Sequence, residues 1–133
     1  KDLRINYDTS WQKQHWSSIL SAYNSSPFFE YYQDEIAPLY EKKPRFLLDW
    51  NNKTQELLES LLTLEITLEQ TSEYQKEIIG LDLRDYTFDK QTLPAYTQVF
   101  SEKQGFKPNL SILDLLFNQG PNTESYLQTL CLK

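Results

Sequence analysis

The spacing of apolar residues along the chain predicts helices over most of its length. Apolar positions recur every three or four residues over 10–24, just after polar residues that can cap a helix, and again over 46–64. A further helix is expected to begin with Ser26 as N-cap and Pro27 at its first position, where a missing N–H costs no hydrogen bond. Pro38 interrupts that pattern, so we expect a kink or a fresh short helix there.

The last helix is bracketed by clear start and stop signals. Ser111 is a suitable N-cap, with Asp114 at the third helical position, and Gly120 precedes a proline at the far end. Residues 110–117 are apolar nearly all round. This helix is therefore expected to be buried on most sides or to dock against another chain.

Two segments alternate apolar and polar residues with the period of a half-buried strand. They are residues 2–7 and residues 64–68, and the second could pair beside the first. Residues 72–96 have no sustained period and predict a long irregular connection. The predicted fold class is α+β, a predominantly helical single domain over residues 1–133. Its two short strands would be completed by a missing N-terminal β-containing part.

Composition removes several functional classes. Thirteen Lys and Arg against nineteen Asp and Glu give a formal net charge of −6, which repels the phosphates of nucleic acids. The single cysteine cannot form a disulfide within the chain, and this favours a reducing, cytoplasmic compartment. No apolar run is long enough to span a membrane. Glycine-rich phosphate loops, the G-x-S-x-G motif and the H-E-x-x-H zinc motif are all missing, and we expect no metal.

The only histidine of the chain lies among aromatic residues in the first helix. Trp11 and His15 are four residues apart, so they share a helical face on which the imidazole can stack against the indole. An imidazole with its ordinary pKa of about 6.5 can act as a general acid or base at neutral pH. Packing at the edge of the core explains a lone histidine as well, and both interpretations stay open.

Two further candidate binding residues lie outside that helix. Tyr31 is expected to be the exposed member of the tyrosines in "EYYQDEIAPLY", which either pack in the core or line a pocket. Arg84 lies between Asp82 and Asp85 in the irregular segment. It either binds an anionic substrate or pairs with these neighbouring carboxylates.

A family resemblance is carried by the segments "RINYDTSWQKQHWSSILSAYNSSPFFEYY", "FLLDWN" and "GFKPNLSILDLLFNQGP". They are similar to the WbqC-like family of bacterial proteins, through the W-x-x-x-H-W spacing from Trp11 to Trp16 and the block from Gly105 to Pro121. The closing block resembles a Bacteroidetes-type branch. Because members extend further at the N-terminal side, the resemblance implies that this chain is a C-terminal portion.

The resemblance implies a role in surface-polysaccharide or O-antigen biosynthesis, as a transferase that moves an aminoacyl group onto an amino sugar. A sugar or sugar nucleotide would be the small-molecule partner, and no particular cofactor is indicated. In such an enzyme His15 would be the proton shuttle. Trp11 and Tyr31 would stack on sugar, and Arg84 would contact an anion. The competing interpretation is a non-catalytic interaction domain that forms a homodimer, or docks another partner, through residues 110–117.

Overall fold

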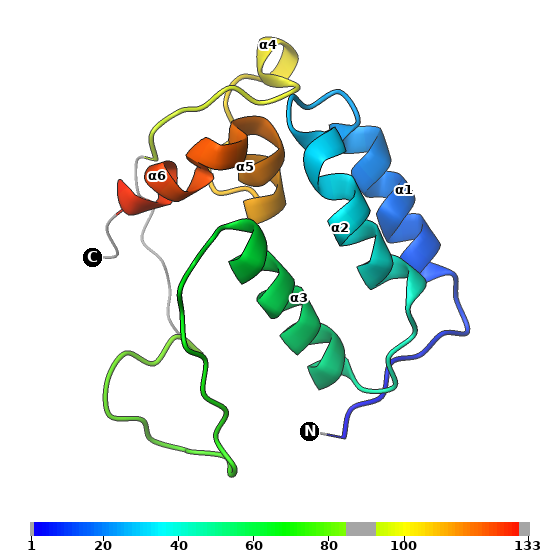
Figure 1. The fold of residues 1–133 in the computed structure, drawn as a ribbon, viewed down its shortest axis with the longest axis vertical. Coiled ribbons are helices and arrows are strands. Elements are labelled where there is room, and N and C mark those ends of the chain that lie inside the picture. The colour runs from blue at the N-terminus through cyan, green and yellow to red at the C-terminus, as the bar shows by residue number, and fades with distance from the viewer. Residues whose placement is uncertain (1, 85–92, 131–133) are drawn as a thin grey trace.

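The computed structural model describes residues 2–84 and 93–130, and helices make up its framework (Figure 1). In chain order they are α1 (Trp11–Tyr23), α2 (Phe29–Glu41), α3 (Leu47–Leu61), α4 (Ser101–Gln104), α5 (Ile112–Gln119), the 3-10 turn η1 (Gly120–Asn122) and α6 (Thr123–Gln128). Contacts join α2 to α1, to α3 and to α5. α2 is therefore the central helix, and the other long helices pack around it.

Three helices lie where local signals predict them. α1 coincides with the expected helix to within one residue at each end. α3 ends three residues before the end of its expected range, because Thr63 takes a left-handed φ of 53° and the next N–H donates back to the carbonyl of Glu59. α5 begins after Ser111, whose side chain accepts a hydrogen bond from the N–H of Leu113. The predicted N-cap of α5 is confirmed.

The β part of the predicted α+β class is wrong. Residues 64–68 form no strand, and the structure's described residues contain no sheet, only one isolated antiparallel bridge between Arg4 and Phe46. Backbone hydrogen bonds of 3.1 and 2.9 Å flank this bridge. Ile66 and Leu68 are more than half exposed. An alternating pattern becomes a strand only when another extended segment pairs with it. Leu64 packs against the core, but no described segment pairs with residues 64–68.

No fresh helix begins at Pro38, since α2 runs through this residue to Glu41; a kink there stays a prediction. A proline cannot donate to the carbonyl four residues earlier, but Pro38 lies in the last turn, where few later hydrogen bonds depend on it. The N–H of Lys42 still donates to the Pro38 carbonyl at 3.2 Å. At its other end α2 begins at Phe29 rather than at Pro27.

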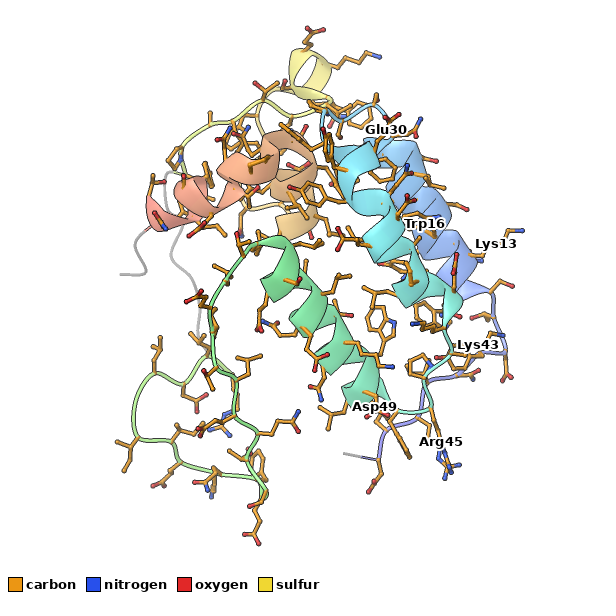
Figure 2. The ribbon with its side chains drawn as sticks, viewed as in Figure 1. Lys13, Trp16, Glu30, Lys43, Arg45 and Asp49 are labelled. Atoms are coloured by element: carbon orange, nitrogen blue, oxygen red, sulfur yellow. The ribbon has the colours of Figure 1, made fainter. Side chains whose placement is uncertain are left out.

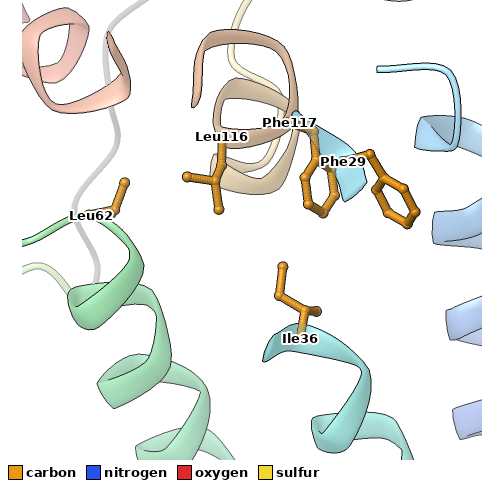
Figure 3. Packing of buried hydrophobic residues seen from close by; sticks show 5 residues of the cluster. All are labelled: Phe29, Ile36, Leu62, Leu116 and Phe117. Atoms are coloured by element: carbon orange, nitrogen blue, oxygen red, sulfur yellow. The ribbon is translucent and has the colours of Figure 1, made fainter. Parts of the chain in front are cut away.

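The hydrophobic core lies where α2, α5 and the end of α3 meet (Figure 3). Its members are Phe29, Ile36, Leu62, Leu116 and Phe117. The rings of Phe29 and Phe117 meet edge to face with their centroids 5.0 Å apart, and both side chains are fully buried. Partners within this chain thus cover Leu116 and Phe117. Homodimerisation through residues 110–117 stays a prediction, for which Leu110 is the most exposed apolar side chain of that segment.

The segment that follows α3 is irregular over residues 65–84. The missing periodicity predicts an irregular connection over residues 72–96, of which residues 85–92 lie outside the described ranges. It extends away from the helices in Figure 1, on the far side of α3 from α1. Within the ranges that the structure describes, no helix is long and apolar enough to cross a membrane.

Candidate functional site

Trp11 and His15 make the contact that their spacing predicts. The two ring centroids are 5.2 Å apart and the rings meet edge to face, at 65°. The Trp11 indole also meets Trp50 of α3 edge to face at 5.8 Å, and its Nε1–H donates to the carbonyl of Asn6 at 3.1 Å. Helix spacing places the imidazole over the indole, and the fold adds a second indole from α3.

The His15 imidazole remains accessible on this aromatic support. Its side chain is exposed, and its ring lies 6.4 Å from that of Tyr40. Neither ring nitrogen forms a hydrogen bond with a residue in the part of the chain that the structure describes. The imidazole is therefore oriented by ring contacts, and its nitrogens are left to hydrogen-bond with a bound molecule.

Tyr40 connects His15 with a pocket on the other side of α1. Besides its contact with His15, the Tyr40 ring stacks on Trp16 at 5.7 Å and meets Trp50 edge to face at 6.2 Å. Burial raises the pKa of the Tyr40 phenol, so the hydroxyl stays protonated and can donate a hydrogen bond at neutral pH.

The pocket beside Tyr40, here called the α1–α2 pocket, has a volume of about 300 Å³. Tyr7, Lys13, Trp16, Tyr40, Glu41 and Lys43 are among its lining residues. Figure 2 shows Lys13 and Lys43 on the same side of the molecule, near the beginning of α1 and the end of α2. One pocket therefore presents aromatic rings together with two cations and one carboxylate.

Side chains that bond to the backbone of the α2–α3 connection hold the walls of this pocket. The Tyr7 hydroxyl donates to the carbonyl of Pro44 at 2.7 Å, and the Lys43 ammonium lies 5.5 Å from the centre of the Tyr7 ring. Gln12, which is 7% exposed, donates through Nε2 to the carbonyl of Lys42 at 2.6 Å. The pocket thus keeps its shape without a ligand, and ordering it costs little when one binds.

The cations at this end of the molecule are not neutralised by direct pairing. Among the described residues the only ion pair joins Arg84 to Asp82, so Lys13, Lys43 and their neighbour Arg45 carry charge that no carboxylate contacts within 4 Å. Lys13 and Lys43 therefore line the pocket without a direct ion pair, and ammonium groups of this kind attract anionic ligands.

The other two residues predicted for the site lie elsewhere. Tyr31 is 79% exposed, as expected, but it occupies the first turn of α2, about 14 Å along the helix from Tyr40. Its one ring partner within the described residues is Phe28. The structure does not bring Tyr31 together with His15.

Arg84 pairs with its neighbour instead of facing the helices. Its guanidinium hydrogen-bonds to both carboxylate oxygens of Asp82 and donates to the carbonyl of Gln75 at 2.6 Å. These hydrogen bonds lower the pKa of Asp82 to about 2. Asp85, the other predicted neighbour, lies outside the described residues. No three His, Cys, Asp or Glu side chains gather as metal ligands in the part of the chain that is described.

Sequence reasoning did not find the α1–α2 pocket. Lys13 and Lys43 are thirty positions apart, and only the packing of α1 against α2 brings them to one pocket. A run of cations, "KKPR", between two predicted helices of an acidic chain was the available signal. This run indicates a basic connection between the helices, but it does not predict which other helix packs beside that connection.

The helical packing and this pocket define a helical domain with an aromatic pocket, lined by two lysines, at one end. The chain belongs to the WbqC-like protein family, whose model matches residues 1–84 and 79–126. The family resemblance seen in the sequence is thereby confirmed. No curated protein and no solved structure matches the chain.

Proposed function

We propose that this protein is a transferase of surface-polysaccharide or O-antigen biosynthesis, which moves an aminoacyl group onto an amino sugar in the cytoplasm. In this proposal the α1–α2 pocket receives the sugar in a phosphorylated form, such as a sugar nucleotide. The observation that carries it is the gathering of Lys13 and Lys43 with Tyr7, Trp16 and Tyr40 at one preformed pocket. Family membership supports the process, and the pocket supports the substrate class.

The chemistry of the pocket lining matches a phosphorylated sugar. Ammonium groups form charge-assisted hydrogen bonds with phosphate oxygens, and aromatic faces pack against the apolar face of a sugar ring. The volume of about 300 Å³ is at the lower end of the range of small-molecule sites. It is suited to one sugar ring with its phosphate, with the remainder of a nucleotide lying outside along the basic α2–α3 connection.

His15 is proposed as the proton shuttle of the transfer. The amino group of the acceptor attacks the carbonyl carbon of the aminoacyl donor, a C–N bond forms, and the bond to the donor's leaving group breaks. The nitrogen then loses a proton, which an exposed neutral imidazole can accept and pass to the leaving group. Tyr40 contacts His15 and also lines the pocket, so it links the imidazole to the α1–α2 pocket. Trp11 keeps the imidazole in place.

Two roles predicted from the sequence change in this proposal. The anion contact is given to Lys13 and Lys43 rather than to Arg84, because the guanidinium of Arg84 already binds a carboxylate. The stacking surface is given to Tyr7 and Tyr40, and Tyr31 is left as a separate exposed ring.

Titration with UDP-glucosamine, followed by tryptophan fluorescence, tests the binding half of this proposal. We expect Lys13→Gln and Lys43→Gln each to weaken binding by about tenfold or more, as the loss of one charge-assisted hydrogen bond requires. The matched control is Lys76→Gln, in the exposed segment after α3, which should bind like the parent protein. Equal affinity in all three variants would remove the α1–α2 pocket from the proposal.

Transfer of labelled glycine from an activated glycyl donor to UDP-glucosamine tests the catalytic half. We expect His15→Gln to bind the sugar nucleotide normally and to lose transfer. If the parent protein binds but does not transfer, the pocket assignment stands and the transferase assignment falls. If His15→Gln transfers as fast as the parent protein, the proton shuttle is another group.

A further inference from the structure

Asp114 is a buried carboxylate that forms no ion pair with the described residues. The residue is 4% exposed, and its Oδ1 accepts hydrogen bonds from the Tyr96 hydroxyl at 2.6 Å and from Nε2 of Gln98 at 3.2 Å. Within residues 2–84 and 93–130, no Lys, Arg or His nitrogen lies within 4 Å of it. Burying an ionised carboxylate opposes folding unless hydrogen bonds and opposite charge offset the lost hydration. Here hydrogen bonds alone provide that compensation.

Two phenols lie near Asp114, and the hydroxyl of one of them, Tyr96, donates to its Oδ1. Burial, and then the negative charge of Asp114, raises the pKa of Tyr23 to about 12. Burial and the hydrogen bond to the same carboxylate raise the pKa of Tyr96 as well. Both hydroxyls therefore stay protonated at neutral pH. The hydrogen bonds from Tyr96 and Gln98 both go to Oδ1 of Asp114, so the acceptor positions of Oδ2 remain.

Asp114 lines a cavity of about 120 Å³ between the last turn of α1, the 98–107 loop and the beginning of α5. Its other lining residues include Ala22, Tyr23, Gln98, Val99 and Leu110. Apart from Asp114 and the polar tips of Tyr23 and Gln98, these side chains are apolar. Gln104 and Lys107 complete the polar part of the lining, so the cavity combines an acidic and a basic residue with a small apolar space.

The 98–107 loop is held in shape by the same network. Gln98 is buried, donates to the carbonyl of Lys107 at 2.9 Å and accepts from the N–H of Lys107 at 2.8 Å. The hydroxyl of Ser101 donates to the Gln98 carbonyl at 2.8 Å. Lys107 also lines the cavity, but no ion pair within 4 Å joins it to Asp114 among the described residues. Hydrogen bonds therefore fix the wall, while no described cation forms an ion pair with Asp114.

We infer that this cavity is a second ligand site, which binds the ammonium group of a small primary amine through Asp114. A water molecule occupies about 30 Å³ of liquid, so the cavity holds roughly four non-hydrogen atoms. An ammonium group on one to three carbon atoms fits that space, with its nitrogen at the carboxylate and its carbons against Ala22 and Val99. Ala22 is about 14 Å along α1 from Lys13, so this site is separate from the α1–α2 pocket and does not depend on the proposed function.

An NMR titration of the whole chain with methylammonium and ethylammonium chloride tests this site. We expect saturable chemical-shift changes at the side-chain amide of Gln98 and at the backbone amides of Ala22 and Leu113. Sodium chloride and tetramethylammonium chloride at the same ionic strength should not produce them, because neither cation carries an N–H donor. Shifts that do not saturate, or that all four salts produce equally, would overturn the inference.

Two variants separate the charge from the space. Asp114→Asn keeps the acceptor for Tyr96 but removes the charge, and we expect at least tenfold weaker amine binding. Asp34→Asn, on the exposed surface of α2, is the matched control and should bind as the parent protein does. Ala22→Leu fills the cavity and leaves the carboxylate intact, so it should abolish binding even if Asp114→Asn fails to fold. Unchanged binding in Ala22→Leu would show that the amine does not enter the cavity.

Discussion

Gly120 provides the sharpest test of how α5 is fitted against the α1–α2 turn. It follows α5 with φ 53° and ψ −125°, a backbone conformation that residues with a Cβ rarely adopt. A Cβ built on Gly120 would lie 2.5 Å from two ring atoms of Phe28. The Phe28 ring cannot simply withdraw, because the N–H of this residue is hydrogen-bonded to the Phe117 carbonyl at 3.0 Å. Gly120→Ala therefore introduces both backbone strain and a steric overlap.

The two costs can be estimated separately. Holding a non-glycine residue in such a conformation costs about 1–3 kcal/mol. Forcing a methyl group into a filled site costs about 1–3 kcal/mol more. We expect Gly120→Ala to lose roughly 2–6 kcal/mol of unfolding free energy, a large part of the 5–15 kcal/mol that is typical of a folded protein.

Gly105→Ala is the matched control for backbone strain. Gly105 has φ 70°, and nothing lies within 4 Å of a Cβ built there. It should lose only the first contribution, about 1–3 kcal/mol. Urea unfolding followed by tryptophan fluorescence gives both values, provided that the m-value stays constant. A double-mutant cycle with Phe28→Ala should recover the steric contribution. Equal losses at the two glycines, or no coupling to Phe28, would refute this account of the packing.

Three further predictions concern the core, a helix cap and the exposed ion pair. Leu116→Ala, at a fully buried position, should lose about 2–5 kcal/mol, whereas Leu48→Ala, at a position 36% exposed, should lose less than half as much in the same assay. Ser111→Ala should lower the free energy of unfolding by about 1 kcal/mol, because it removes the acceptor for the Leu113 N–H. The control is Ser18→Ala in the middle of α1, and an equal loss in the two variants would count against the cap. In a carboxyl NMR titration Asp82 should protonate near pH 2 in the parent protein and near its ordinary pKa in Arg84→Gln. Because folding lowers the pKa of Asp82, any stability from the Arg84–Asp82 pair is present above the ordinary Asp pKa and is lost as the pH falls toward 2. The pair is exposed, so the parent protein and Arg84→Gln should unfold at the same acid midpoint.

Helix positions were largely predictable because their signals are local. The three-to-four residue spacing of α1 and the N-cap of α5 depend on neighbours within one or two turns, and each lies at the expected residue. The expected strand at 64–68 does not form and no fresh helix begins at Pro38, for a different reason. A strand depends on a partner far away in the sequence, and the effect of a proline depends on how much of the helix follows it.

The amino-acid sequence by itself determined the helical framework, the Trp11–His15 contact and the membership of the family, because each is encoded by short spacings or by the residues themselves. Only the tertiary structure decided which side chains share a pocket. Lys13 and Lys43 line one pocket because α1 packs on α2, and Asp114 is a buried carboxylate beside a cavity rather than only the third residue of a helix. Burial and long-range proximity arise when helices pack, and no local pattern in the chain carries that information.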